Sequence, residues 1–222
     1  PPRAQRHEGF VMDDESFGHS PVKALALNCT LKPSPEASNT EALLGVVLQA
    51  LQGEGVETET IRVVDRDVRP GVESDMGDGD EWPAIRSALL SAEILIVATP
   101  TWVGKPSSVT QRVIERMDAM LSETDDEDRP VAYNRVAGVV VTGNEDGAHH
   151  VISEVSGALI DIGYTIPGQA WTYWNKGPGP GDSYSETDEG KEWSHSTGRA
   201  AAQNLLAVAR ALADKPMSAP PE

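Results

Sequence analysis

Three short segments of the chain concentrate hydroxyl, amide, glycine and tryptophan residues, which are types suited to binding flat, phosphorylated molecules. The segments are residues 29–40, 100–104 and 142–147. Each one follows an apolar run typical of a buried strand and precedes a helical pattern. Side chains of these types hold a ligand by hydrogen bonding and stacking, so we predict binding sites here and name no catalytic residue.

The first segment places hydroxyl and amide residues and one cation immediately before a helical pattern. The candidate phosphate ligands are Thr30, Lys32, Ser38, Asn39 and Thr40. Free backbone N–H groups and the positive end of the helix dipole favour an anion at such a place. A capping box over residues 38–41, with no ligand at all, explains the same pattern equally well.

The second segment offers an aromatic plane at the end of the most apolar predicted strand. Its candidate ring-binding residues are Pro100, Thr101, Trp102, Val103 and Gly104. Trp102 can pack on a heterocycle, and Gly104 lets main chain approach the polar edge of that ring. For an isolated tryptophan, burial under the loop or in a subunit interface is the stronger alternative. The position directly after a strand is what favours a ligand.

The third segment again joins a strand end to a helix start, with two glycines framing polar residues. Its backbone amides can face a pyrimidine edge and stabilise negative charge on a reduced ring. The alternative is a turn with a helix cap, and we interpret the following His149 and His150 as ordinary helix residues. The candidate ring-binding residues are Thr142, Gly143, Asn144, Asp146 and Gly147.

These segments lie between alternating strand and helix patterns. The predicted strands cover residues 22–28, 56–64, 93–99, 135–142 and 165–174. The predicted helices cover residues 39–53, 82–91, 106–121, 148–162 and about 186–213. Parallel strands need crossover helices, so the alternation predicts an α/β fold with a three-layer, doubly wound, five-stranded parallel sheet. Ligands in such folds bind at the carboxyl ends of the strands, where the three segments are expected.

Composition excludes several classes of function. Acidic residues outnumber basic ones 35 to 18, and the formal charge of −17 argues against nucleic acid as a partner. The single cysteine, Cys29, excludes a disulfide framework and a multi-cysteine metal site within one chain. No apolar run is long enough for a membrane-spanning helix, so we expect a soluble, cytoplasmic protein without a membrane partner. We expect a flexible arm (1–20), one domain (21–214) and a disordered tail (215–222).

Three stretches resemble the flavodoxin-like NAD(P)H-dependent FMN reductases, in particular the branch related to iron–sulfur flavoproteins. They read NCTLKPSPEASNTEALL, TPTWVGKPSSVTQRVIERMD and TGNEDGAHHVISEVSGALIDIGYTIPG. The resemblance extends over residues 22–212. Two features depart from the family: residues 29–32 replace its usual Gly-Ser-Pro-Arg start, and the cluster cysteines are missing, which removes the iron–sulfur centre.

The resemblance implies bound FMN and the strand order 2-1-3-4-5. It places the phosphate at the first segment and the ring between the second and third. It further implies NADH or NADPH as reductant, a small acceptor such as flavin or a quinone, and a homodimer or homotetramer. Trp174 and Tyr184 either close the site or belong to a plain connector at residues 177–184.

The strongest rival function is a non-enzymatic, flavodoxin-type electron carrier, whose acidic surface would suit a basic redox partner. The altered first segment also permits a fold whose flavin site has lapsed. A hydrolase is disfavoured because no GxSxG motif is present. A metal site in the acidic run 75–81 is disfavoured because the run lacks EF-hand spacing, and we interpret it as a solvated loop.

Overall fold

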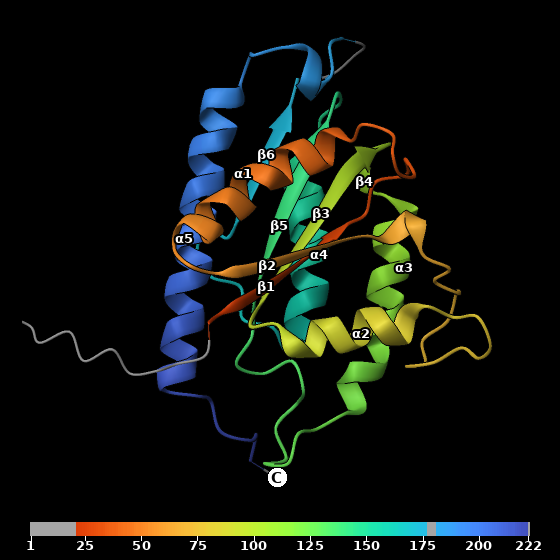
Figure 1. Ribbon diagram of the computed structural model, residues 1–222, viewed down its shortest axis with the longest axis vertical. Helices are drawn as coiled ribbons and strands as arrows, with labels where there is room; N and C mark the ends of the chain where they lie inside the picture. Colours follow the sequence, from red (N-terminus) through yellow and green to blue (C-terminus); the bar gives the residue numbers. More distant parts are fainter. Residues whose placement is uncertain (1–20, 177–180, 222) are drawn as a thin grey trace, which may run out of the picture.

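The computed structural model describes residues 21–176 and 181–221, and its centre is a parallel β-sheet (Figure 1). The expected arm at residues 1–20 and part of the connector at 177–184 lie outside these ranges. The parallel strands are β1 (Lys23–Asn28), β2 (Glu57–Arg62), β3 (Ile94–Trp102), β5 (Val136–Gly143) and β6 (Trp171–Asn175). Their order, β2-β1-β3-β5-β6, is the predicted order 2-1-3-4-5. The flavodoxin-like strand order is therefore confirmed.

Helices cover both faces of the sheet and give the predicted three layers. One face packs on α1 (Asn39–Gly53) and α5 (Lys191–Asp214). The other face packs on α2 (Trp82–Ser91), α3 (Ser108–Met117) and α4 (Ala148–Ile162). Short 3₁₀ turns are η1 (Val63–Asp65), η2 (Asp118–Ser122) and η3 (Tyr184–Glu186). The central strands β3 and β5 are apolar up to Ala98 and Val141, where both of their faces are covered, and become polar toward their carboxyl ends.

Two elements begin about five residues later than predicted, for identifiable reasons. The strand expected from residue 165 begins at Trp171, because Pro167 accepts a turn hydrogen bond from Ala170 and Gln169 adopts a left-handed backbone. Thr165 keeps only an isolated bridge to Val136. The last helix begins at residue 191 instead of about 186, because η3 and an extended residue precede it.

The second predicted loop is partly a hairpin. Strand β3 continues through Trp102 and pairs antiparallel with β4 (Lys105–Pro106). Val103 and Gly104 form the turn, and both have positive φ angles of 52° and 70°. The indole of Trp102 is therefore presented by a strand end, which is a more rigid support than a free loop.

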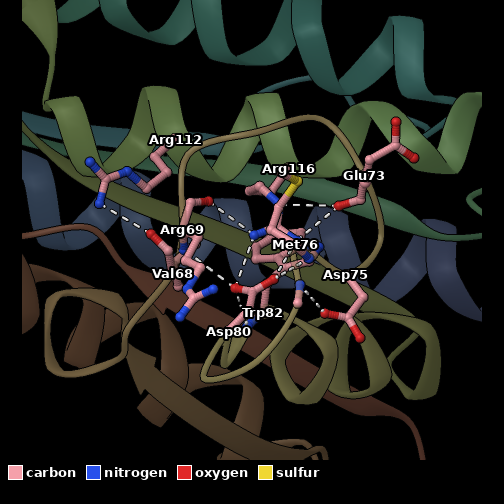
Figure 2. A network of polar contacts seen from close by, with 10 residues as sticks. Val68, Arg69, Glu73, Asp75, Met76, Asp80, Trp82, Arg112 and Arg116 are labelled. Carbon is pink, nitrogen blue, oxygen red and sulfur yellow. Dashed lines mark hydrogen bonds and ion pairs between the residues drawn. The ribbon is translucent and has the colours of Figure 1, made fainter.

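A buried ion pair fastens the long acidic loop after η1 to helix α3 (Figure 2). The guanidinium of Arg116 lies 2.7 Å from the carboxylate of Asp80, and both side chains are fully buried. Arg116 also donates to the carbonyl oxygens of Arg69 and Glu73 at 3.0 and 2.8 Å. Its charge lies 5.5 Å from the ring centroid of Trp82. The expectation of a solvated loop at 75–81 is thus wrong for Asp80, whose carboxylate anchors the loop from inside.

The environment of Asp80 favours its ionised form. Burial alone would raise the pKa of this carboxyl, but the hydrogen bonds from Arg116 and from the main-chain N–H groups of Met76, Trp82 and Arg69 outweigh burial. These donors hold the pKa of Asp80 well below its usual range. The carboxylate therefore stays charged and paired at all but strongly acidic pH.

Breaking this pair should strongly destabilise the fold. Asp80→Asn leaves the Arg116 charge buried without its partner, which costs about 3–5 kcal/mol of the free energy of unfolding in denaturant titrations. The folded-state pKa of Asp80 is depressed, so its contribution is complete above about pH 5 and declines as the pH falls. The difference between wild type and Asp80→Asn should therefore shrink on acidification.

The matched control is Arg66→Ala, which breaks the exposed ion pair with Glu81. Solvent screens that pair, so this variant should unfold almost like wild type at neutral pH. Equal destabilisation by Arg66→Ala and Asp80→Asn would contradict the anchoring role of Asp80.

Candidate functional site

A cavity of about 530 Å³ lies where the three predicted segments meet, at the carboxyl ends of β1, β3 and β5. Its volume falls within the roughly 300–1,000 Å³ common for cofactor sites. Residues from all three segments line it. The predicted site residues that line the cavity are Thr30, Lys32, Asn39, Thr40, Pro100, Thr101, Trp102, Thr142, Gly143 and Asn144.

The first and third segments are joined directly across the base of the cavity. The hydroxyls of Thr40 and Thr142 lie 2.8 Å apart, and both residues are buried. Thr40 belongs to the first turn of α1, whereas Thr142 belongs to the end of β5. This contact places the amino end of α1 next to the carboxyl end of β5. An anion bound at the helix end and a ring bound beside β5 can therefore lie in one cavity.

The first segment is held in place from strand β2. Arg62 donates to the carbonyl oxygen of Glu36 at 2.9 Å and forms an ion pair with Glu41. Ser38 lies outside the cavity lining and caps α1 by accepting from the N–H of Glu41 at 3.2 Å. The Glu41 carboxylate pairs with Arg62, so one half of the expected capping box is present. Lys32 folds back on its own loop and donates to Ala37.

The remaining predicted residues shape the cavity from behind. Val103 and Asp146 are exposed, and the N–H of Val103 donates to the Glu145 carboxylate at 2.6 Å. A Cβ on Gly147 would lie 3.0 Å from the Cα of Gly104. These two glycines let the second and third segments touch through their main chains. Like Ser38, the four residues Val103, Gly104, Asp146 and Gly147 support the lining without belonging to it.

A buried hydroxyl network fixes the hairpin relative to the first segment. Ser107 donates to the carbonyl oxygen of Cys29 at 2.6 Å, and its N–H donates to Thr99 at 3.1 Å. Thr110 donates to the same Thr99 oxygen at 2.8 Å. Burial raises the pKa of the Cys29 thiol to about 12, so it stays protonated and is a poor nucleophile. The network positions the site and supplies no reactive group.

The hydroxyl of one lining residue has no partner in the described part of the protein. Thr101 is 5% exposed, and its Oγ1 has no hydrogen-bond partner among residues 21–176 and 181–221. A buried polar atom without a partner is unfavourable, and a bound polar group relieves that cost. Thr101 packs directly against Gly143, because a Cβ at Gly143 would lie only 2.9 Å from the Thr101 side chain.

A fourth wall comes from the carboxy-terminal part of the chain. Trp174 and Tyr184, which the sequence left undecided, line the cavity with their rings 5.7 Å apart and nearly perpendicular. The Tyr184 hydroxyl lies 2.6 Å from His195, whose pKa is lowered by burial and by nearby cations. The lining also includes Leu31, Glu145 and Ser183, which were not predicted from the sequence. Leu31 and Glu145 were within predicted segments, but their types gave no binding signal.

A sequence profile of NADPH-dependent FMN reductases matches residues 22–177, most of the chain. This protein belongs to the NADPH-dependent FMN reductase family. Its relatives include 8-demethyl-8-aminoriboflavin-5′-phosphate synthase of Streptomyces davaonensis, which is 36% identical over 174 residues, or 74% of this chain and 68% of the synthase. The family resemblance of the sequence is thus confirmed.

A second relative is much longer than this family member. The divalent metal cation transporter MntH of Mycobacterium bovis is 41% identical over 173 residues, which is 76% of this chain. This chain spans 25% of the transporter's length. In the part of the chain that the structure describes, each helix is too short or too polar to cross a bilayer.

Solved structures support the same fold. RosB with bound 8-demethyl-8-formylriboflavin-5′-phosphate superimposes with a TM-score of 0.80 at 34% identity, covering 88% of this chain and 82% of RosB. An NADH:FMN oxidoreductase has a TM-score of 0.56 at 15% identity, covering 83% of this chain and 90% of its own, and shows the fold alone. Together with the family, these similarities relate the chain to flavin-binding oxidoreductases and indicate FMN as its cofactor.

The cavity of this FMN reductase homologue fits that cofactor. The amino end of α1 and the hydroxyls of Thr30 and Thr40 offer donors to a phosphate. The half-exposed indole of Trp102 offers a plane to the ring, and the free Thr101 hydroxyl offers a bond to its polar edge.

Thr101→Val should separate ligand binding from stability. The substitution removes an unsatisfied buried hydroxyl without changing shape, so the flavin-free protein should be as stable as wild type or more stable in thermal unfolding. FMN affinity, measured by fluorescence titration, should fall about three- to tenfold because one hydrogen bond to the ligand is lost.

The control is Thr99→Val, two residues earlier on the same strand. The Thr99 hydroxyl accepts from Ser107 and Thr110, so its loss should destabilise the protein by about 1–3 kcal/mol. The affinity of the folded protein for FMN should change little, because Thr99 lies outside the cavity lining. A stable Thr101→Val variant with wild-type FMN affinity would refute the assignment of Thr101.

Proposed function

We propose that this protein oxidises NADH or NADPH at its FMN and passes the electrons to a small acceptor such as free flavin or a quinone. The proposal rests on the exposed apolar side chains at the mouth of the cavity. Leu31 and Trp102, from the first and second segments, both line the cavity and are 42% and 54% exposed. A nicotinamide must stack on an accessible flavin face, and apolar side chains around that face favour a flat ring.

The chain's own contribution to this reaction is positioning and electrostatics. FMN, when bound, supplies the hydride acceptor and the route of electrons to the next compound. The α1 amino end and the third segment both line the cavity, where their donors stabilise negative charge on phosphate and ring. Glu145 is turned away from such a role, because its carboxylate accepts the N–H of Val103. No side chain needs to act as a catalytic acid.

A second candidate function follows from the similarity to the synthase. The chain is 36% identical to an enzyme named for making an 8-amino flavin phosphate, and it superimposes on RosB carrying an 8-formyl flavin phosphate. In that case the flavin phosphate in this cavity would be the substrate and would leave changed at position 8. The same residues would bind it, so the cavity supports both candidates and the experiment must separate them.

The proposed reductase activity predicts a spectroscopic change. Adding NADH or NADPH to the FMN-loaded protein without oxygen should bleach the visible flavin band at catalytic rates, and adding a quinone should restore it. An unchanged spectrum would favour the electron carrier and contradict the proposal. A flavin phosphate recovered with altered mass would favour the synthase-like reaction.

Trp102→Ala tests the site of the nicotinamide. Loss of the ring at the cavity mouth should lower kcat/KM for the nicotinamide about tenfold or more, because stacking area is lost. Trp193→Ala is the control, since Trp193 is similarly exposed at 47% and lies outside the cavity lining. Equal rates for both variants would place the nicotinamide elsewhere.

The proposal keeps the expectation that the protein works in the cytoplasm as a homodimer or homotetramer. Support comes from aromatic residues on the edge strand β6 and on α5: the rings of Trp171 and Tyr173 are 5.9 Å apart, and those of Tyr173 and Trp193 are 4.9 Å apart. Aromatic residues are enriched in subunit interfaces. Light scattering of the full chain measures the number of copies.

A further inference from the structure

Residues 181–186, which we name the strap, form the fourth wall of the cavity through Ser183 and Tyr184. The strap is tied to two sides of the cavity by asparagine side chains. Asn39 of α1 accepts the N–H of Ser185 at 3.1 Å. Asn144 of the third segment donates to the carbonyl oxygen of Gly181 at 3.1 Å.

The strap is a shaped element with its own internal bonds. The Ser183 N–H donates to the Glu186 carboxylate at 2.8 Å and completes a capping box around η3. On the side away from the cavity mouth, Tyr184 lies against His195. Further along the chain, the Trp174 indole N–H donates to the carbonyl oxygen of Glu189 at 2.7 Å. The strap thus contacts α5 through Tyr184 and His195, contacts β6 through the rings of Tyr184 and Trp174, and is bonded to the two asparagines.

The two asparagines form hydrogen bonds of opposite direction with the strap. Asn39 uses its side-chain oxygen as an acceptor, whereas Asn144 uses its side-chain nitrogen as a donor. Both residues line the cavity, and both were expected to contact FMN from their positions in the sequence. The atoms engaged with the strap are not free for the flavin. The other side-chain atoms, Nδ2 of Asn39 and Oδ1 of Asn144, make no bond to the strap, so the rates of flavin exchange must distinguish a direct contact from an effect through the strap.

We propose that Asn39 and Asn144 are positioning residues that fasten the strap beside the flavin and thereby slow the entry and exit of FMN. The inference rests on the flavin site described above and adds the way in which the cofactor is retained. An element held by a few solvent-accessible hydrogen bonds opens locally at a modest free-energy cost. Removing one bond makes opening more frequent, so flavin should both leave and enter faster.

The flavin-free protein tests the fastening itself. Hydrogen exchange of residues 181–186 should accelerate about three- to tenfold in Asn39→Ala and Asn144→Ala, because each loses one hydrogen bond. Asn39→Asp should keep wild-type protection, because a carboxylate still accepts the Ser185 N–H. Asn144→Asp should lose protection, because a carboxylate cannot donate to Gly181. The same exchange in all four variants and wild type would overturn the proposal.

The FMN-loaded protein tests the consequence for the cofactor. In stopped-flow fluorescence, Asn144→Ala should raise both the dissociation and the association rate of FMN about three- to tenfold. Faster dissociation with an unchanged association rate would show direct contact between Asn144 and the flavin and would refute the positioning role. Wild-type values for both rates would refute it as well.

Asn204→Ala is the matched control. Its side chain also donates to a glycine carbonyl, that of Gly168, at 2.9 Å, and the bond lies outside the cavity lining and the strap. This variant should leave strap exchange and flavin rates unchanged. The two proposals fail separately: a flavin that NADH and NADPH do not bleach counts against the reductase alone, whereas the exchange pattern in flavin-free protein decides the strap.

Discussion

The site depends on one constraint, the parallel pairing of three neighbouring strands. Asn28 of β1 pairs with Ala98 of β3, and Pro100 of β3 pairs with Thr142 of β5. With all strands running the same way, the chain must leave each of them at the same edge of the sheet and return through a helix. Three loops with separate sequences therefore meet at one place. The hydroxyl contact between Thr40 and Thr142 then closes the gap that remains between two of them.

Much of the fold followed from local patterns. Continuous apolar runs identified β1, β3 and β5, and helical spacing located α1, α2 and α4 at their observed bounds. The start of β6 could not be predicted from the sequence, because the turn at Pro167 interrupts a segment whose pattern still resembles a strand. Asp80 was taken for a solvated residue because glycines and other carboxylates surround it in the sequence. Its partner Arg116 is 36 residues away, a relationship that only the tertiary structure reveals.

The site, like the fold, could be predicted only in part from the sequence. Ten of the predicted residues line the cavity because position at a strand end is readable from sequence. Ser183 escaped prediction because its place depends on bonds from Asn39 and Asn144, which join distant parts of the chain. Family membership adds what geometry alone would leave open, namely FMN as the cofactor. The similarity to a synthase named for a flavin phosphate indicates that one scaffold can bind a flavin phosphate either as a cofactor or as a substrate.

The contact between Gly104 and Gly147 bears on how such a scaffold diversifies. With the two main chains touching, a side chain at Gly147 would push the hairpin away from its neighbour, so drift at this point is costly. Leu31 and Trp102, by contrast, are exposed side chains at the cavity, so a change there displaces no neighbouring main chain. Natural divergence and directed evolution toward new electron acceptors should both change these exposed positions. The main-chain contact between Gly104 and Gly147 should stay constant.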